Sequence, residues 1–323
     1  MSTRIPLLLG AAQFGAPNTS GVRVTDLTAV QELVDVFFSN GQVGIDTARF
    51  YAGGTSEELV GRLDFRDVGR VDTKNWPMQP GGHSAVTLKE TFEATVKALN
   101  GKKIRVYYLH KPDRSVPYEE TLEAINDLYK AGGFEQFGIS NYAAWEVAEI
   151  VGICARRGFI KPTVYQGVYN LLDRLTEAEL FPCLRKLGLA YAAYMPLASG
   201  FLTEQFALPG SGAALPSKFD ARFWAHASFY TSRYFPGAPA VAELREVAHA
   251  HGLTLTEVAL RWLQWHSKLQ PGDHGVVVGA NKIEHLRTTL ADSAKGPLPE
   301  PVVQACEDVW TKTKGKISHT YFF

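Results

Sequence analysis

The chain contains only three cysteines among its 323 residues, and they are far apart. Cys154, Cys183 and Cys306 include no Cys-x-x-Cys pair, and an odd number of thiols cannot be fully paired. This usage is typical of reduced thiols in a cytoplasmic protein. It excludes the class of small, secreted scaffolds that disulfides hold together.

Neither sign of charge is in excess. Lys and Arg together number 33, Asp and Glu together number 33, and no stretch of the chain concentrates one sign. A protein that binds nucleic acid or an anionic membrane surface usually has a basic patch. We therefore expect neither of these partners, and we expect a small-molecule substrate instead.

No apolar run is long enough to cross a bilayer. The run from Leu187 to Leu202 is too short and contains Pro196. Near the N-terminus, residues 5–12 follow the single positive charge of Arg4 and continue into a glutamine. This stretch has the shape of a short signal peptide, but the weak positive region favours a first β-strand, and secretion is the alternative.

Short apolar runs alternate with amphipathic helical patterns along the whole chain, which predicts a parallel sheet covered by helices. A hydrophobic content of 46% suffices for a large core. The pattern predicts strands at 6–12, 43–48, 71–75, 105–110, 135–140, 163–168, 190–195 and 275–279. Eight such units predict one (β/α)8 barrel domain over 1–323, with a long loop at about 199–236, an extra helix at 299–313 and a C-terminal tail.

An open, doubly wound sheet is the competing architecture. That fold usually has a Gly-x-Gly-x-x-Gly turn after its first strand, where a dinucleotide binds. The segment from Gly10 to Gly15 reads Gly-Ala-Ala-Gln-Phe-Gly and does not supply the turn. The barrel is therefore the preferred prediction.

Polar residues recur where the predicted strands end. They are Asp46, Lys74, His110, Asn141, Gln166 and Tyr194, at successive gaps of 28, 36, 31, 25 and 28 residues. Taken singly, each has an ordinary structural explanation; Asn141, for example, could cap the following helix. In a barrel, however, the carboxyl ends of all strands meet on one face, where active sites lie. Their recurrence in consecutive units predicts a shared pocket.

Asp46, Lys74, Tyr51 and His110 form a set suited to acid catalysis at a carbonyl group. A buried lysine or aspartate is costly unless it is paired, so Asp46 and Lys74 are expected to form an ion pair. An ammonium beside Tyr51 would lower the pKa of its phenol from about 10. Tyr51 would then donate a proton while a neutral His110 orients the carbonyl oxygen, and the sequence offers no metal-binding set. Five further histidines show no metal-ligand spacing with carboxylates and are expected at the surface or in loops: His83, His226, His249, His251 and His274.

Several stretches of this sequence together resemble the aldo-keto reductase superfamily, and closely the aflatoxin-aldehyde reductase family. They are residues 44–51 (GIDTARFY), 72–74 (DTK), 108–113 (YLHKPD), 138–147 (GISNYAAWEV), 162–167 (PTVYQG), 179–185 (ELFPCLR) and 196–200 (PLASG). The resemblance extends over nearly the whole chain. It implies a (β/α)8 barrel that binds extended NADPH without the Gly-rich turn and reduces aldehydes with a tetrad of Asp46, Tyr51, Lys74 and His110.

The resemblance also implies further site residues. Ser140, Asn141 and Gln166 would hold the nicotinamide carboxamide, and Tyr194 would stack on its ring. The pyrophosphate would lie in the run from Met195 to Thr203, which includes Pro196, Leu197, Ala198, Ser199 and Gly200, together with Arg222. The 2′-phosphate would meet the segment from Gly279 to Leu286, with Lys282 as its cation. Tyr230 and Arg233 match a pair that contacts substrate in relatives, and Trp76 is expected to add an aromatic surface.

Three departures from the family pattern bear on cofactor and substrate. Glu204-Gln205 replaces Gly-Lys, His285 and Thr289 replace Gln and Asn near the adenine, and Phe323 replaces a terminal arginine. In relatives that arginine can meet a carboxylated aldehyde. We therefore expect Phe323 to line the pocket and to bias it toward neutral aldehydes.

Two other functions stay open at this point. Lys74 could act as the nucleophile of a Schiff-base aldolase on the same barrel. Alternatively, the barrel could bind the nucleotide without turnover, as a sensing subunit. The sequence does not identify the physiological aldehyde, and it is compatible with a monomer or a homodimer.

Overall fold

Eight parallel strands close into a barrel in the computed structural model, which describes residues 3–206, 219–220, 227–317 and 321. The strands are β1 (Leu7–Gly10), β2 (Gly44–Asp46), β3 (Arg70–Asn75), β4 (Ile104–Leu109), β5 (Phe134–Ser140), β6 (Val164–Val168), β7 (Ala190–Tyr194) and β8 (Gly275–Val278). Each strand pairs with the next along the chain, and β8 pairs with β1. The predicted (β/α)8 barrel is confirmed, and the N-terminal apolar stretch is its first strand.

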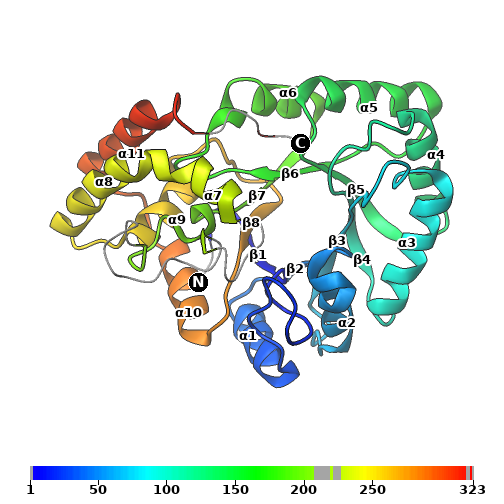
Figure 1. The fold of residues 1–323 in the computed structure, drawn as a ribbon, viewed down its shortest axis with the longest axis horizontal. Helices are drawn as coiled ribbons and strands as arrows, with labels where there is room; N and C mark the ends of the chain where they lie inside the picture. The colour runs from blue at the N-terminus through cyan, green and yellow to red at the C-terminus, as the bar shows by residue number, and fades with distance from the viewer. Residues whose placement is uncertain (1–2, 207–218, 221–226, 318–320, 322–323) are drawn as a thin grey trace.

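Helices surround the ring of strands, as Figure 1 shows. Those that follow the first six strands are α1 (Leu27–Ser39), α2 (Thr55–Arg62), α3 (Ala85–Ala98), α4 (Tyr118–Lys130), α5 (Ala144–Arg157) and α6 (Leu180–Leu187). After β7 come α7 (Ala227–Tyr234), α8 (Ala238–Ala250) and α9 (Leu255–Trp265), and after β8 come α10 (Ile283–Ser293) and α11 (Glu300–Thr313). The extra C-terminal helix therefore lies where the sequence predicted it.

The long irregular stretch predicted at 199–236 is wrong in its last part, because α7 occupies residues 227–234. The prediction rested on the Gly and Pro content of the whole stretch, whereas this window contains neither residue. Ala227, Arg233 and Tyr234 are buried, so tertiary packing stabilises a helix that composition did not indicate. Residues 207–218 and 221–226 of the stretch lie outside the described part of the chain.

Three helices begin at a residue whose side chain caps the first turn. Asp26, Ser84 and Thr254 accept hydrogen bonds from the backbone N–H groups of Ala29, Thr87 and Glu257. Such caps satisfy N–H groups that have no partner inside the helix. Helix α5 begins differently: Ala143, the residue before its first turn, donates its backbone N–H to the Glu146 carboxylate at 2.8 Å. The suggestion that Asn141 caps this helix is therefore wrong.

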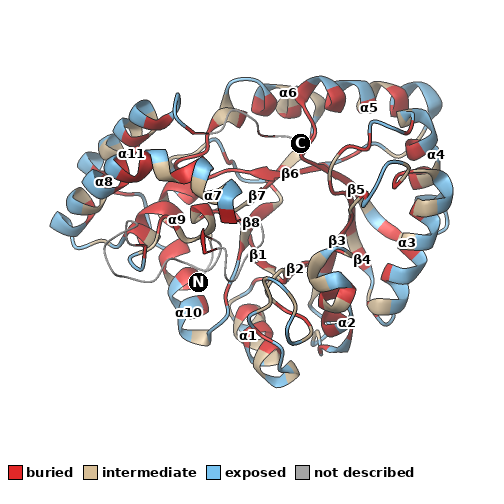
Figure 2. Cartoon of the chain, in the orientation of Figure 1, coloured by how far each residue is buried: buried red, intermediate tan, exposed pale blue. Residues whose placement is uncertain are grey.

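Two apolar regions stabilise the barrel. The larger lies between the strands and the helices, while a small interior cluster consists of Leu8, Val106, Tyr108, Val164 and Ala192, with Val277 packed against it. In Figure 2 the strands are mostly buried and the helices expose their outer sides.

Glycines on two strands make room for bulky side chains inside the barrel. A Cβ on Gly44 would lie 2.8 Å from Nη2 of Arg105, and one on Gly138 would lie 2.3 Å from the Tyr108 ring. The glycines on β2 and β5 therefore let an arginine and a tyrosine from β4 occupy the interior. The single-domain boundary at 1–323 stays a prediction.

Candidate active site

The four proposed catalytic residues lie at the carboxyl ends of neighbouring strands. Asp46 is the last residue of β2, Lys74 is in β3, and His110 directly follows β4. Tyr51 opens a short 3-10 helix, η1 (Tyr51–Gly54), between β2 and α2. Gly54 has a φ of 96°, and a Cβ there would overlap the Arg49 guanidinium, so this turn requires glycine.

Lys74 and Asp46 form a buried ion pair. Nζ of Lys74 donates to Oδ1 of Asp46 at 2.6 Å and to the backbone oxygen of Thr47 at 2.7 Å, and its side chain is 0% exposed. Oδ2 of Asp46 accepts from Nε2 of Gln166 at 2.7 Å. Burial raises the pKa of Asp46, and the Lys74 ammonium acts in the opposite direction. The predicted ion pair is confirmed.

Tyr51 lies beside this pair, but its acidity differs from the expectation. Nζ of Lys74 is 5.1 Å from the centre of the Tyr51 ring. The pKa of Tyr51 is nevertheless raised well above 10, first by burial and then by the charges of Asp46 and Tyr230. The expected lowering of the pKa of Tyr51 is wrong, because burial of the phenol raises its pKa and the Asp46 carboxylate adds to that rise. The phenol therefore keeps its proton.

His110 is neutral in this site. Burial, and then the charges of Lys74 and Lys111, lower the pKa of His110 well below 6.5. Its ring makes an edge contact with Tyr51 at 5.7 Å between centroids. A neutral imidazole beside a protonated phenol matches the expectation of one hydrogen-bond donor and one acid.

A second buried histidine lies behind the first. His83 is 1% exposed, and burial lowers its pKa to about 4. The backbone oxygen of Asn75 links the two histidines: it accepts from the backbone N–H of His110 at 2.8 Å, and the His83 ring also bonds to it. The expectation that His83 is a surface or loop residue is wrong in its exposure, because the residue lies in a loop but is buried there, and a lone histidine carries no pattern that would reveal this.

The residues expected to hold the nicotinamide ring lie together. Nδ2 of Asn141 donates to Oγ of Ser140 at 2.9 Å and to the backbone oxygen of His110 at 3.0 Å. The Tyr194 hydroxyl donates to Oδ1 of Asn141 at 2.8 Å. Asn141 has a φ of 64°, so the chain turns sharply after β5 and directs this amide across the face of the barrel. Gln166 is the partner of Ser140 in the β5–β6 register, and it also bonds to Asp46.

The segment that follows β7 has an unusual backbone. Met195, Ala198, Ser199 and Gly200 all have positive φ values, of 59°, 48°, 60° and 102°. The hydroxyl of Ser199 is buried and has no hydrogen-bond partner in the described structure. Left-handed turns of this kind present backbone N–H groups to an anion, and a buried hydroxyl without a partner is itself unusual. The segment therefore fits a pyrophosphate group.

The residues expected near the 2′-phosphate begin α10. Gly279 follows β8, Lys282 is exposed at the start of the helix, and His285 is exposed on its first turn. Thr289 is buried instead and contributes to packing. Arg222 lies outside the described residues.

Glu204 belongs to a separate cluster. Its carboxylate accepts from the backbone N–H of Leu255 at 2.7 Å and lies 3.1 Å from Nε2 of His249. Glu204, which stands where the family has glycine, therefore binds the end of the loop after β7 to α8 and α9.

Trp76, one of the expected substrate residues, packs against His110 of the tetrad. Its ring is 4.9 Å from that of His110. Arg233 is 4% exposed and bonds to Asp173, with Nε to Oδ2 at 2.7 Å. Tyr230 is near enough to raise the pKa of Tyr51. Phe323 lies outside the described residues.

Two residues beside the site were missed by the sequence analysis. Phe50 stacks on Trp76 at 5.1 Å, and Nζ of Lys111 lies 4.5 Å from the centre of the same ring. Each directly adjoins a predicted catalytic residue in the sequence, and this adjacency was the available signal. The stacked rings of Phe50 and Trp76 therefore form an aromatic wall beside His110, and the ammonium of Lys111 lies against it.

Comparison with known proteins is consistent with this geometry. The model of the aldo/keto reductase family matches residues 6–311. The chain belongs to the aldo/keto reductase family. An aldo-keto reductase of Pseudocercospora fijiensis is 41% identical over 87% of this chain and 97% of its own. Two human proteins, aldo-keto reductase family 7 member A3 and aflatoxin B1 aldehyde reductase member 4, are 38% and 37% identical, each over 94% of this chain and 93% of its own.

The described residues include neither a cluster suited to a metal ion nor a helix suited to crossing a membrane. These residues contain no group of three His, Cys, Asp or Glu side chains placed to hold a metal ion. Within the same ranges no helix is both long and apolar enough to span a bilayer. Cys154, Cys183 and Cys306 are all unpaired.

The low pKa of His83 generates a prediction about stability. The folded protein resists protonation of His83 down to about pH 4, whereas an unfolded histidine binds its proton near pH 6.5. Stability should therefore fall as the pH falls through this window, by about 2 kcal/mol between about pH 7.5 and pH 5 for this residue alone. Urea unfolding at both pH values measures the effect.

His83→Gln should reduce that loss. His251→Gln, which replaces a histidine at an exposed position after α8, serves as the matched control. An unchanged pH dependence in His83→Gln would contradict the prediction.

Proposed function

We propose that this protein reduces aldehydes or ketones to alcohols with NADPH, and that Tyr51 donates the proton. The observation that carries the proposal is the buried Lys74–Asp46 pair beside a protonated Tyr51 and a neutral His110 at one end of a barrel. The relatives named aflatoxin B1 aldehyde reductases support aldehydes as the substrate class.

In the proposed reaction the substrate carbonyl lies between Tyr51 and His110. NADPH, when bound, supplies the hydride. The imidazole of His110 donates a hydrogen bond to the carbonyl oxygen and fixes its position. The Tyr51 hydroxyl then gives its proton to that oxygen as negative charge develops. Because Lys74 and Asp46 are paired with each other, together they place no net charge beside the Tyr51 hydroxyl.

The proposed cofactor residues suit the parts of NADPH. Ser140, Asn141 and Gln166 offer amide and hydroxyl groups for a carboxamide, and Tyr194 offers a ring. The left-handed segment from Met195 to Gly200 and the buried Ser199 hydroxyl suit the pyrophosphate. Lys282, at the positive end of α10, suits the 2′-phosphate. We include Gly279, His285 and Arg222 in the same proposed site.

The surroundings of Lys74 argue against a Schiff-base aldolase. A nucleophilic lysine must be accessible and lose its proton. Lys74 is fully buried, and its ammonium donates to a carboxylate and to a carbonyl. A nucleotide-sensing subunit would bind NADPH without reducing any aldehyde, so measurable turnover with an aldehyde distinguishes the proposal from this alternative.

The role of Tyr51 is tested by Tyr51→Phe, which removes only the hydroxyl. We expect kcat to fall about 10²- to 10⁴-fold, the usual contribution of a general acid. NADPH binding, followed by quenching of protein fluorescence, should persist. Tyr129→Phe, on the outer face of α4, is the matched control. If Tyr51→Phe keeps more than about a tenth of the wild-type rate, Tyr51 is not the acid.

The choice of cofactor is tested at Lys282. A charge-assisted contact is worth about 1.5–3 kcal/mol, so Lys282→Ala should weaken NADPH binding by roughly one to two orders of magnitude. NADH binding should change little, because it lacks the 2′-phosphate. Lys130→Ala at the end of α4 is the control. If kcat/KM is the same with NADPH and NADH, and Lys282→Ala does not change it, then Lys282 does not bind the 2′-phosphate.

Substrate charge follows from the cations near the site. Arg233 is compensated by Asp173, the ammonium of Lys111 lies against the Trp76 ring, and Phe323 stands where relatives have an arginine. A carboxylated substrate would therefore lack one positive partner, at a cost of about 2–5 kcal/mol if the pair is buried. The Phe50–Trp76 wall favours an apolar or aromatic substrate instead. We propose that neutral aromatic aldehydes are preferred over anionic ones.

This preference is measured as kcat/KM for a neutral aromatic aldehyde and for succinic semialdehyde. The neutral aldehyde should be reduced more efficiently by the wild type. Phe323→Arg should narrow the difference by supplying the missing cation, whereas Phe323→Leu should not. A wild-type preference for the anion would rule the idea out.

A further inference from the structure

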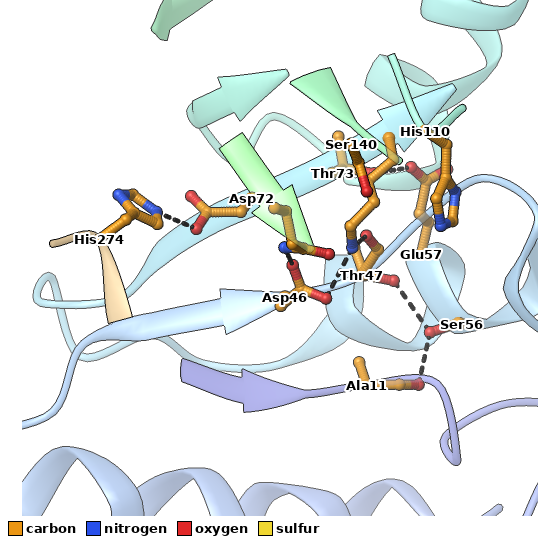
Figure 3. Close-up of polar contacts among 12 residues, drawn as sticks. Ala11, Asp46, Thr47, Ser56, Glu57, Asp72, Thr73, His110, Ser140 and His274 are labelled. Carbon is orange, nitrogen blue, oxygen red and sulfur yellow. Dashed lines mark hydrogen bonds and ion pairs between the residues drawn. The ribbon is translucent and has the colours of Figure 1, made fainter. Parts of the chain in front are cut away.

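A second buried ion pair lies inside the barrel, away from the proposed reacting groups. Asp72 is in β3, two residues before Lys74, so both side chains point to the same side of the strand. Its carboxylate is 0% exposed and accepts from Nε and Nη2 of Arg105 at 2.7 and 2.6 Å. Nε2 of His274, which directly precedes β8, lies 2.8 Å from the same carboxylate (Figure 3). Asp72 is therefore held by three hydrogen-bonding contacts.

Asp72 is also the direct neighbour of Asp46. The two residues are partners in the β2–β3 register, and Figure 3 shows both carboxylates in one region with His274 on the far side of Asp72. The backbone N–H of Thr47 donates to the backbone oxygen of Asp72 at 2.9 Å. Asp72 is one of the charges that raise the pKa of Asp46. The two carboxylates therefore interact across the strands.

These four charged side chains form a quartet: Asp46, Lys74, Asp72 and Arg105. Two of them are negative and two are positive, so their net charge is zero. They lie beside the interior cluster of Leu8, Val106, Tyr108, Val164 and Ala192, and the exposed fractions of the four side chains are 16% for Arg105 and 0–3% for the others. A net charge in such surroundings is screened weakly, so loss of one member changes the potential felt by the others.

We propose that Asp72, clamped by Arg105 and His274, is a positioning residue that keeps the quartet neutral and thereby sets the proton affinity of Tyr51 through Lys74 and Asp46. The inference rests on the proposed function, because Tyr51 is taken as the acid. Gly44 on β2 leaves room for the Arg105 guanidinium, because a Cβ at this position would lie 2.8 Å from Nη2 of Arg105.

The groups that face Asp72 define what can titrate around it. Arg105 and Tyr108 come from β4, Asp46 from β2, Lys74 from β3 itself, and His274 from the residue before β8. β5, β6 and β7 contribute Gly138, Val164 and Ala192 to the interior, and Gln166 bonds to Asp46. Outside the barrel, Asp273 next to His274 is neutralised by Arg185 at 2.6 Å.

The test is the pH profile of kcat for aldehyde reduction. Asp72→Asn keeps the shape of the side chain and removes its charge, so the quartet gains a net positive charge. Tyr51 should then lose its proton more easily, and the alkaline limb of the profile should move down by about half a pH unit to one unit. On that limb this corresponds to a loss of about three- to tenfold in rate.

Glu146→Gln is the matched control for a purely structural effect. Glu146 is a fully buried carboxylate that Arg114 contacts through Nε and Nη2 at 2.8 and 3.1 Å, but it lies on α5 outside the barrel. Its neutralisation should lower stability without moving the alkaline limb. A shift in Glu146→Gln equal to that in Asp72→Asn would overturn the proposal.

Two further variants test charge directly and serve if Asp72→Asn does not fold. Arg105→Gln leaves the quartet negative and should move the limb upward. The double variant Asp72→Asn/Arg105→Gln is neutral again and should return the limb to within about 0.3 unit of the wild type. An unmoved limb in Asp72→Asn or Arg105→Gln, or no return in the double variant, overturns the inference. The wild-type assay is run first: absence of NADPH-dependent turnover overturns the proposed function, whereas normal turnover with unmoved limbs overturns only the role of Asp72.

Discussion

The structure depends on one constraint, which is that the ammonium of Lys74 is completely removed from water. A buried charge is tolerated only with a counter-charge and with its remaining donors satisfied. Asp46 supplies the charge and the Thr47 carbonyl the second acceptor. Gln166 then bonds to the other oxygen of Asp46, which connects β6 to β2 across the interior. The geometry of the catalytic face follows from this network, since the positions of β2, β3 and β6 are fixed together.

Neutrality of that network shapes the chemistry beside it. Because Asp46 compensates Lys74, the phenol of Tyr51 experiences burial more than it experiences a cation, and its pKa rises. His110 is likewise buried and neutral. Tyr51 therefore keeps its phenolic proton, and His110 stays in its neutral form, over a broad pH range, which suits the roles proposed for them. The Asp72–Arg105 pair beneath them extends the same balance of charge through the barrel.

The loop after β7 differs from the charged network, because its unusual feature is its backbone conformation and not a set of charged side chains. Four residues between Met195 and Gly200 have positive φ values, and strained backbone of this kind is stable only when the surrounding structure holds it. Asn170 donates to the backbone oxygen of Met195 at 3.0 Å, and Arg245 bonds to the backbone oxygens of Thr203 and Phe206. Glu204, which departs from the family pattern, adds anchoring to α8 and α9. The loop is thus held from outside the proposed cofactor site.

The alternation of apolar runs and amphipathic helices predicted a parallel sheet covered by helices. The count of eight such units, together with the missing Gly-rich turn after the first strand, favoured a closed barrel over an open sheet. The same spacing brought Asp46, Lys74, His110, Asn141, Gln166 and Tyr194 to one face, since strand ends converge in a barrel. The sequence did not determine the pKa of Tyr51 or the partner of Arg233, because both depend on which charges are adjacent after folding. It also did not reveal the helix at 227–234, His83 behind His110, or the pairing of Asp72 with Arg105. Those features arise from packing between segments far apart in the chain, and no local pattern encodes which buried charges become neighbours.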